Sequence, residues 1–366
     1  MLSYYNPVKI IKTKDWNFEL NRNIKNLNIT SPFIISSFGN RKRLELDSKF
    51  NGKKIFSDIV SNPNFDDCTK VIEFCNNNSF DGVIAIGGGS VMDLAKIVVA
   101  KLSLNKSDIS ELISFKDKYP NNTPSIFIPT THGTASEVTM WGTIWNTKKK
   151  KKYSISHPDL YPTIAILDGS LTLSLPMKNS IITVMDALSH SFEAIWNKNS
   201  NIKSTEYAIE AITIILNNAQ FLKEKPSDQN IRNKLLWAST LAGLAFSNTK
   251  TAAAHSMSYP LTIHYGIPHG IASSISLIPL LEINGNSIES ELNIICNLLN
   301  VSLDELINKI NQIPEGVLSY KLSDWGLKRE DLEFLSNESF TKGRMDNNIV
   351  DLSSKDVLQI FEQLYN

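Results

Sequence analysis

The sequence contains few cysteines, and the three that are present, Cys68, Cys75 and Cys296, are scattered along the chain. An odd number of cysteines without regular spacing is not typical of a disulfide framework, which small secreted proteins use to stabilise their folds. We therefore expect reduced, buried thiols and a cytoplasmic protein.

The sequence also lacks an excess of charge and any long apolar run. Lys and Arg together number 37, as do Asp and Glu, and this balance argues against general binding to nucleic acid or to membrane surfaces. No apolar run is long enough to span a bilayer, and residues 1–16 contain no continuous apolar region like that of a secretory signal. We expect a small-molecule partner, with neither nucleic acid nor membrane involved.

At 366 residues the chain is long enough for two domains with cores of their own. In the first half, short apolar runs alternate with helical patterns, which predicts a mainly parallel sheet with helices on both faces. The expected strands are residues 32–36, 55–59, 82–86, 125–128 and 163–167. The expected helices are residues 66–77 and 91–100, and the expected hairpin is residues 141–146 and 153–156, around the lysine run 148–152.

Beyond residue 175 long helical patterns replace the strands. They cover residues 179–196, 204–223, 229–247 and 252–264, and shorter helices without comparable strands follow. We predict an α/β domain over residues 1–175 and an all-helical domain over residues 176–366.

The strand at residues 82–86 leads directly into GGGS (87–90) and then into a helix. Glycines allow a ligand close to the backbone, and the free N–H groups of a helix N-terminus favour an anion, so this turn predicts a phosphate-binding loop. It is not the Gly-x-Gly-x-x-Gly dinucleotide pattern, and a purely structural glycine turn is the alternative.

A second polar turn, PTTHGT (129–134), follows the strand at residues 125–128. Ligands of open α/β sheets gather at the carboxyl ends of the strands. Two polar turns there predict one extended ligand, most simply a dinucleotide.

Three of the six histidines, His255, His264 and His269, lie close together in one stretch. Upstream, Asp186 and His190 are one helical turn apart, so their side chains are expected on one face of a helix. With His255 and His269 they form a set of one carboxylate and three imidazoles that suits divalent iron or zinc. The alternatives are a surface pair for Asp186 and His190 and an ordinary turn at His269.

The motifs GGGSVMDLAK (87–96), PTTHGTASEVT (129–139) and MDALSH (185–190), followed by His255 and His269, occur in a specific order. In this order the chain resembles the iron-containing (group III) alcohol dehydrogenases, from about residue 30 to residue 285. The resemblance implies a Rossmann-like α/β N-terminal domain and an all-α C-terminal domain, as in dehydroquinate synthase, with a cleft for NAD(P) and a divalent metal between them. The metal would be Fe²⁺, with Zn²⁺ as the alternative, and the assembly a homodimer or higher homo-oligomer.

Carried over by position, the resemblance assigns residues to each ligand. It assigns the metal to Asp186, His190, His255 and His269. It assigns the cofactor to Gly88, Gly89, Ser90, Asp93, Thr130, Thr131, Thr134, Ser136 and Lys152, with the first three on the pyrophosphate.

Three positions depart from the family pattern. Tyr259 replaces a histidine that the family often uses in substrate or proton handling, so Tyr259 is a candidate proton donor after water and the ribose hydroxyls. His132 and Ala135 stand where the family often has Ala and Gly.

The family's acidic residue for the adenosine ribose of NAD aligns with Ser37, and Arg41, Lys42 and Arg43 lie just beyond. Without a carboxylate to repel a 2′-phosphate, and with cations nearby, NADPH is expected to be accepted, and the hypothesis extends to a preference for NADPH over NADH.

Further stretches resemble one branch of the family, the phosphonoacetaldehyde reductases, which make 2-hydroxyethylphosphonate. They are WGTIWN (141–146), KYSISHPDLYP (152–162), SHSFEAIWNKNSN (189–201), SNTKTAAAHSMSYP (247–260) and GRMDNN (343–348). An anionic substrate needs cations, and the candidates are Lys250, expected in a helical and largely apolar setting, and Arg344, expected in a loop. Both could instead be solvated, and sulfoacetaldehyde, succinic semialdehyde and lactaldehyde are alternative substrates.

The resulting prediction is a metal-dependent NAD(P)H aldehyde reductase, in which the metal polarises the aldehyde oxygen and the nicotinamide supplies hydride. One rival is a dehydroquinate synthase-like lyase, which a Glu in place of Asp186 and more basic residues would indicate. The other is a non-catalytic nucleotide-binding module, which an incomplete ligand set would favour. Neither pattern is present.

Overall fold

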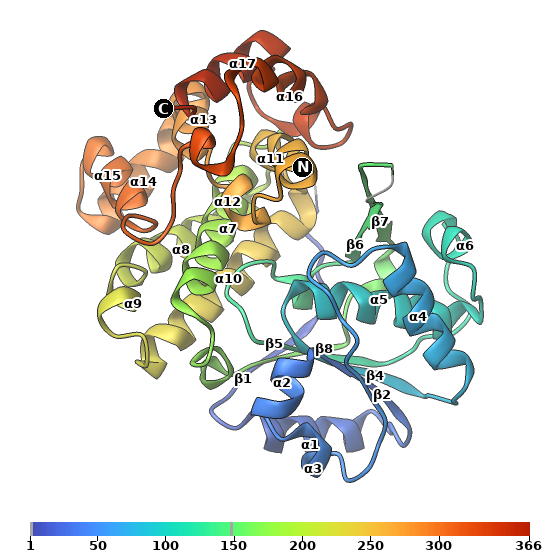
Figure 1. The fold of residues 1–366 in the computed structure, drawn as a ribbon. Coiled ribbons are helices and arrows are strands. Elements are labelled where there is room, and N and C mark those ends of the chain that lie inside the picture. The colour runs from blue at the N-terminus through green and yellow to red at the C-terminus, as the bar shows by residue number, and fades with distance from the viewer. Residues whose placement is uncertain (1–2, 147–148) are drawn as a thin grey trace. The chain divides into compact units, whose positions relative to one another are not determined.

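The computed structural model describes residues 3–146 and 149–366, and its contacts divide the chain into two compact units (Figure 1). The α/β unit comprises Asn6–Thr131 and Ala135–Thr172. The helical unit comprises Leu173–Asn366, the segment His132–Thr134 and the described residues up to Tyr5. The predicted fold class, an α/β N-terminal part and an all-helical C-terminal part, is confirmed.

The α/β unit is built on a parallel sheet of six strands in the order β1-β8-β5-β4-β2-β3. The strands are β1 (Lys9–Lys12), β2 (Pro32–Ser36), β3 (Ile55–Phe56), β4 (Gly82–Gly87), β5 (Ser125–Pro129) and β8 (Ile164–Leu167). The prediction missed β1, and it extended β3 too far, to residue 59. Both are edge strands with only two apolar residues each, so their patterns are short.

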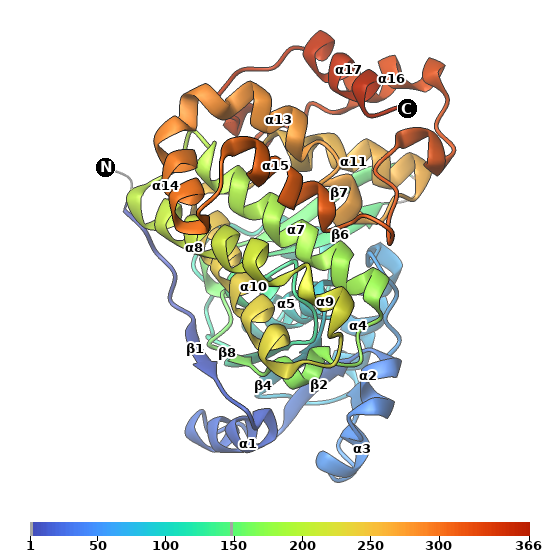
Figure 2. The ribbon, with the colours of Figure 1, turned by 90° about the vertical axis from the view of Figure 1, so that its left-hand side faces the viewer.

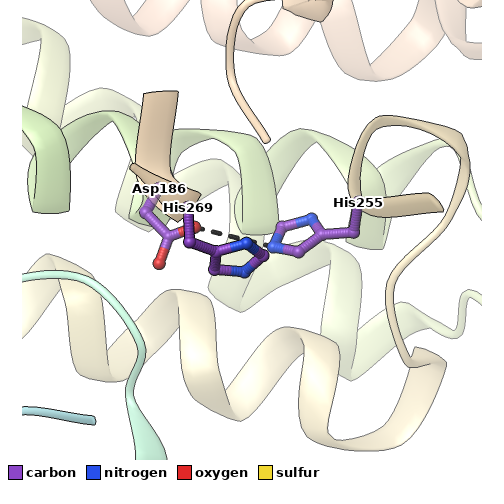
Figure 3. Close-up of side chains that lie close together, drawn as sticks. All are labelled: Asp186, His255 and His269. Carbon is purple, nitrogen blue, oxygen red and sulfur yellow. Dashed lines mark ion pairs between the residues drawn. The ribbon is translucent and has the colours of Figure 1, made fainter. Parts of the chain in front are cut away.

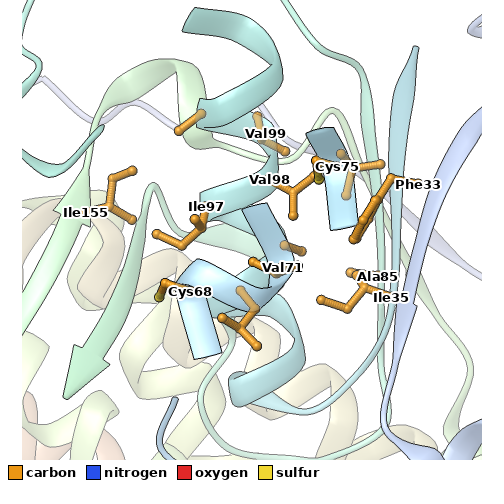
Figure 4. Close-up of a cluster of buried hydrophobic side chains, with 14 of the residues drawn as sticks. Phe33, Ile35, Cys68, Val71, Cys75, Ala85, Ile97, Val98, Val99 and Ile155 are labelled. Carbon is orange, nitrogen blue, oxygen red and sulfur yellow. The ribbon is translucent and has the colours of Figure 1, made fainter. Parts of the chain in front are cut away.

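Alternate residues of the central strands face two separate cores. Phe33 and Ile35 of β2 lie in register with Val83 and Ala85 of β4, and all four join the core beneath helices α4 (Phe65–Asn76) and α5 (Gly89–Leu104) (Figure 4). The intervening apolar residues of these strands join a second core with α1 (Trp16–Asn26) and α3 (Leu46–Lys49). The expected helices on both faces of the sheet are therefore present.

The expected hairpin is present as β6 (Trp141–Asn146) and β7 (Lys151–Ser156), which pair antiparallel. Lys152 lies in β7 opposite Trp145, with its Nζ 5.7 Å from the centre of the indole ring. Lys148, at the start of the lysine run, lies outside the described residues. Helix α6 (Ile109–Ser114) packs against β7.

The helical unit has α7, α8 and α10 in mutual contact at its centre (Figure 2). Its helices are α7 (Met177–Ile195), α8 (Ile202–Asn218), α9 (Phe221–Glu224), α10 (Gln229–Thr249), α11 (Ala253–Tyr265), α12 (His269–Ala272), α13 (Leu277–Asn284), α14 (Glu289–Leu299), α15 (Leu303–Gln312), α16 (Leu332–Glu338) and α17 (Ser354–Gln363). One continuous helix expected over residues 204–223 is instead α8 and α9. The amide of Asn218 donates to the Ile214 carbonyl, a local bond of the kind that competes with helix continuation.

The three cysteines are free, as expected, and burial raises the pKa of Cys68 and Cys75 to about 12. Cys296 is half-buried, contrary to the expectation of a fully buried thiol. None of the helices in the described part of the chain is both long enough and apolar enough to cross a membrane.

The short segment His132–Thr134 packs within the helical unit. A Cβ at Gly133 would lie 2.8 Å from the Thr183 carbonyl oxygen, so only glycine permits this approach to α7. His132 is fully buried, and neither ring nitrogen has a hydrogen-bond partner among the described residues. Burial, with a smaller contribution from the Arg232 charge, lowers the pKa of His132 to about 3.

We expect His132 to make the stability of the protein depend on pH. The pKa of His132 is about 3 in the folded chain, below the ordinary 6.5. On acidification the imidazole is therefore protonated in the unfolded chain at a pH at which it is still neutral in the folded chain. Stability therefore falls as the pH drops below about 6.5, by up to about 1.4 kcal/mol per pH unit. Between pH 7.5 and pH 5, the wild type should lose about 2 kcal/mol more than His132→Ala in urea unfolding. The same pH dependence in both proteins would contradict this.

Candidate functional site

The GGGS turn and the start of the PTTHGT turn lie side by side at the carboxyl edge of the sheet in the α/β unit. Strands β5, β4 and β2 are neighbours, and Gly87 at the end of β4 is in register with Pro129 at the end of β5. The Thr130 N–H donates to the Gly87 carbonyl at 3.1 Å. The structure thus brings together the GGGS turn and the first threonine of the PTTHGT turn.

The GGGS turn leaves no room for side chains. A Cβ at Gly87 would lie 2.4 Å from Cγ2 of Val91, and one at Gly88 would lie 3.0 Å from Cγ2 of Thr131. Gly88 is the N-cap of α5, so the first N–H groups of this helix, including those of Gly89 and Ser90, have no helical acceptor. These features fit a pyrophosphate, which needs close backbone approach and N–H donors.

A buried lysine on α5 holds Ser136, one of the residues predicted to line the cofactor. Lys96 is fully buried, and its Nζ donates to Ser136 Oγ (2.8 Å), Thr139 Oγ1 (2.9 Å) and the Trp141 carbonyl (2.7 Å). Ser136 Oγ in turn donates to Asp93 Oδ1 at 3.0 Å. Burial lowers the pKa of Lys96 to about 7 and raises the pKa of Asp93. Sequence reasoning missed Lys96, although it lies one turn after Asp93 on α5.

Two further predicted cofactor residues lie near this edge of the sheet. Ser37 is the N-cap of α2 (Phe38–Arg43) and accepts from the Asn40 N–H, while the Asn40 amide donates to Thr130 Oγ1 at 3.2 Å. Lys152 acts electrostatically on Asp93, whose pKa its positive charge lowers against the effect of burial. Thr134, by contrast, belongs to the segment that packs in the helical unit.

The structure corrects one argument about the basic residues after Ser37. Arg41 forms an ion pair with Asp47 at 2.6 Å, and this bond raises the pKa of the guanidinium. Arg41 is thus engaged and does not supply a free cation for a 2′-phosphate. Arg43 folds over Gly39, with its Nη1 3.1 Å from the place a Cβ would occupy.

Three of the four predicted metal ligands converge inside the helical unit. Asp186 comes from α7, His255 from α11 and His269 from the start of α12, and one donor atom of each lies within 4.8 Å of the others (Figure 3). His255 Nε2 lies 3.6 Å from Asp186 Oδ1. Asp186 and His255 are buried and His269 is half-buried. One carboxylate and two imidazoles, shielded from water, fit a divalent iron or zinc ion.

His190, the fourth predicted ligand, lies beside this group. Its ring stacks on Phe246 at 4.0 Å and on His255 at 4.3 Å between centroids. Burial alone would raise the pKa of Asp186, but the charge of His190 and the hydrogen bond from His255 lower it well below its ordinary value. His190 thus contributes to the same buried cluster, and its role as a ligand stays a prediction.

Small residues bring α12 close enough to α7 for this convergence. A Cβ at Gly270 would lie 2.3 Å from the Ile182 carbonyl oxygen, so a larger residue would push His269 away from α7. Ser273 at the end of α12 donates to Asp186 Oδ1 at 2.8 Å and orients the carboxylate. Sequence reasoning missed Ser273, for which the sequence offers no local pattern.

A second acid missed by sequence reasoning supports His255 from the other side. Glu193 is fully buried, and its Oε1 accepts from the N–H groups of Ala252 (2.9 Å) and His255 (3.0 Å). Its Oε2 pairs with His255 Nδ1. Glu193 follows Asp186 by two helical turns on α7, a spacing that could have revealed it.

Tyr259, the candidate proton donor, is brought next to the metal ligands. Its ring lies 6.4 Å from that of His269 between centroids, at an angle of 18°, and the side chain is half-buried. Its role stays a prediction.

The structure contradicts the setting predicted for Lys250. Helix α10 ends at Thr249, and Lys250 is exposed, with φ 64° and ψ −179°. This conformation is costly for a residue other than glycine, and it lies in the short connection between α10 and α11. The helical pattern of the sequence continues through this position and so could not reveal the turn. Asn197 donates to the Lys250 carbonyl at 3.2 Å and fixes the corner.

One amide ties the Lys250 corner to the loop that carries Arg344. Asn347 Nδ2 donates both to the Gly343 carbonyl and to the Thr251 carbonyl, each at 2.9 Å. Gly343 directly precedes Arg344 in the chain, and Thr251 directly follows Lys250. The structure therefore places the backbones of Lys250 and Arg344 close together, with Arg344 half-buried.

Comparison with known families matches almost the whole chain. Residues 7–169 match the model described as "Iron-containing alcohol dehydrogenase". Residues 180–365 match "Fe-containing alcohol dehydrogenase family, C-terminal".

Individual relatives match most of the chain. A 4-hydroxybutyrate dehydrogenase from Clostridium kluyveri is 28% identical over 350 residues, covering 92% of each chain. A 1,3-propanediol dehydrogenase from Citrobacter freundii is 27% identical over 85% of this chain and 83% of its own. The crystal structure of sulfoacetaldehyde reductase from Bifidobacterium kashiwanohense in complex with NAD⁺ superposes with a TM-score of 0.89, at 27% identity, over 100% of this chain and 99% of its own.

Proposed function

This chain belongs to the iron-containing alcohol dehydrogenase family, and we propose that it reduces a small anionic aldehyde with NAD(P)H at a site built on Asp186, His255 and His269. The observation that carries this proposal is the buried convergence of one carboxylate and two imidazoles from three helices. The substrate we propose is phosphonoacetaldehyde, which would yield 2-hydroxyethylphosphonate.

When bound, a nicotinamide cofactor would supply the hydride, and a divalent iron would supply Lewis-acid stabilisation of negative charge on the substrate oxygen. Asp186, His255 and His269 would hold the iron, with His190 as the fourth ligand. Ser273 and Glu193 orient two of these ligands through the hydrogen bonds described above. Tyr259, whose ring lies beside that of His269, is the candidate of this chain for donating the proton to the product oxygen.

Two observations support an anionic substrate. First, the backbones of the cations Lys250 and Arg344 lie close together. The Glu193 carboxylate accepts from the Ala252 N–H near Lys250 and also pairs with His255, so it connects the Lys250 corner to the proposed metal site. Two of the relatives are named for substrates with an acidic group, sulfoacetaldehyde and 4-hydroxybutyrate. Sulfoacetaldehyde and succinic semialdehyde are therefore the main alternatives to phosphonoacetaldehyde.

We expect Lys250→Ala to raise KM for phosphonoacetaldehyde by about 10- to 100-fold, because a hydrogen bond to a charged group contributes about 1.5–3 kcal/mol. KM for the neutral aldehyde propanal should change by less than about twofold, since propanal has no anionic group to bind. Steady-state kinetics with both aldehydes measure the difference. Lys342→Ala, an exposed lysine of the Arg344 loop, is the control and should change neither value. Equal effects of Lys250→Ala on both aldehydes would remove Lys250 from the anion site.

We propose that the enzyme accepts NADPH as well as NADH. The residue directly after β2 is Ser37, which caps α2 and carries no carboxylate, and the Arg43 guanidinium folds back over Gly39. Arg43, whose Nη2 donates to the neutral Asn40 amide oxygen, is therefore a better candidate for a 2′-phosphate than Arg41, whose charge Asp47 neutralises.

The proposed function is tested by a spectrophotometric screen of the iron-loaded enzyme with anionic and neutral aldehydes of two to four carbons. Each aldehyde is assayed with NADH and with NADPH. We expect the highest kcat/KM for phosphonoacetaldehyde and measurable turnover with NADPH. A preference for neutral aldehydes would contradict the substrate, and no coenzyme oxidation with any aldehyde would contradict the function.

A further inference from the structure

Both ring nitrogens of His255 face a carboxylate of α7. Nε2 lies 3.6 Å from Asp186 Oδ1, and Nδ1 pairs with Glu193. Figure 3 shows the first of these contacts as a dashed line. The imidazole thus presents one nitrogen to the ligand cluster and the other to Glu193.

We propose that Glu193 is the positioning residue of the metal site, because it fixes His255 in the tautomer that presents Nε2 to the metal. This inference rests on the proposed metal site. An ionised carboxylate can only accept hydrogen bonds, so Nδ1 must carry a proton, and Nε2 is the nitrogen left for coordination once a metal displaces the proton that it shares with Asp186 in the metal-free protein.

Glu193 also fixes where the ring stands, because it binds the backbone that carries it. The Oε1 atom accepts from the N–H groups of Ala252, the N-cap of α11, and of His255 itself. One carboxylate therefore caps the first turn of α11 and orients the imidazole on that turn. This double attachment leaves His255 little freedom to turn away from Asp186.

Asn197, one turn beyond Glu193 on the chain, offers a matched control. It is buried, and its amide donates to the Lys250 carbonyl in the same corner. No described hydrogen bond or ring contact joins Asn197 to Asp186, His255 or His269. A change at Asn197 disturbs the corner and leaves the His255 tautomer as it is.

The experiment replaces Glu193 with glutamine. In Glu193→Gln the side-chain carbonyl can still accept from the two N–H groups, but the NH₂ group donates to His255 Nδ1. The ring proton then moves to Nε2 and blocks coordination. Titration of the metal-free proteins with Zn²⁺ against a chelator should give a Kd about 10- to 100-fold higher for Glu193→Gln than for wild type. The absorption bands of the Co²⁺-loaded variant should change as well.

The controls separate this role from a merely structural one. Asn197→Ala should bind Zn²⁺ within about twofold of wild type, and thermal unfolding of metal-free Glu193→Gln should stay close to that of the wild type. Equal Zn²⁺ affinity and unchanged Co²⁺ bands in Glu193→Gln would overturn the inference. A wild type that binds no metal would instead overturn the proposed function.

A measurement on the wild type keeps the inference testable if Glu193→Gln does not fold. In the Zn²⁺-loaded protein labelled with ¹⁵N-histidine, NMR should show a proton on Nδ1 of His255 and zinc on Nε2. The His255 signals are identified by their loss in His255→Ala. Zinc on Nδ1, or a proton on Nε2, would overturn the inference.

Discussion

Replacing Asp186 with alanine should lower kcat/KM for aldehyde reduction by about a thousandfold or more. Lewis-acid stabilisation by a metal contributes several kcal/mol to such a reaction, and each 1.36 kcal/mol corresponds to a tenfold change in rate. Asp186 is the only carboxylate in the converging group, so its loss removes the negative charge that offsets that of the ion. Stopped-flow or steady-state kinetics of the iron-loaded variant, together with metal analysis, measure both effects.

Ser191→Ala is the matched control for this substitution. Ser191 is buried on α7 near Asp186, but its hydroxyl donates to the Ala187 carbonyl one turn earlier and not to the ligand cluster. It should retain metal and lose less than about twofold in kcat/KM. Full activity of Asp186→Ala, or metal content equal to that of wild type, would contradict the assigned role.

Replacing Lys96 with methionine should lower the free energy of unfolding by about 3 kcal/mol, because three buried acceptors lose their donor. The same change should weaken binding of the coenzyme, since Ser136 would no longer be held against Asp93. Urea unfolding measures the first effect, and fluorescence titration with NADH and NADPH measures the second.

Lys101→Met is the control, because Lys101 is a second largely buried lysine of α5. No described hydrogen bond holds its ammonium group, so its loss should cost less than about 1 kcal/mol. If both lysine variants were destabilised equally, the special role of the Lys96 bonds would be refuted.

The central strands of the sheet could be predicted because they are buried on both faces. Phe33, Ile34 and Ile35 are all fully buried, and such continuous apolar runs mark parallel strands covered by helices. β1 lacked this pattern, since Ile10 and Ile11 stand between two lysines at the sheet edge. Its pairing with β8 depends on residues far along the chain, which no local pattern reveals.

The candidate site shows the same division between local and distant contacts. The spacing of Asp186 and His190 is local, so both could be placed on one face of α7. Glu193 pairs with His255 across 62 positions of sequence, and this contact arises only when α11 packs near α7. Lys250 was placed in a helix because its neighbours have helical patterns, whereas its left-handed backbone follows from the turn into α11.

The central claim, that a divalent iron is held by Asp186, His255 and His269, is tested most directly by anomalous diffraction from crystals of the iron-loaded protein. Data collected on either side of the iron absorption edge should show one strong peak within coordination distance of these three side chains, about 2.0–2.2 Å from each donor atom. A site without such a peak, or a peak elsewhere with these side chains pointing apart, would contradict the account.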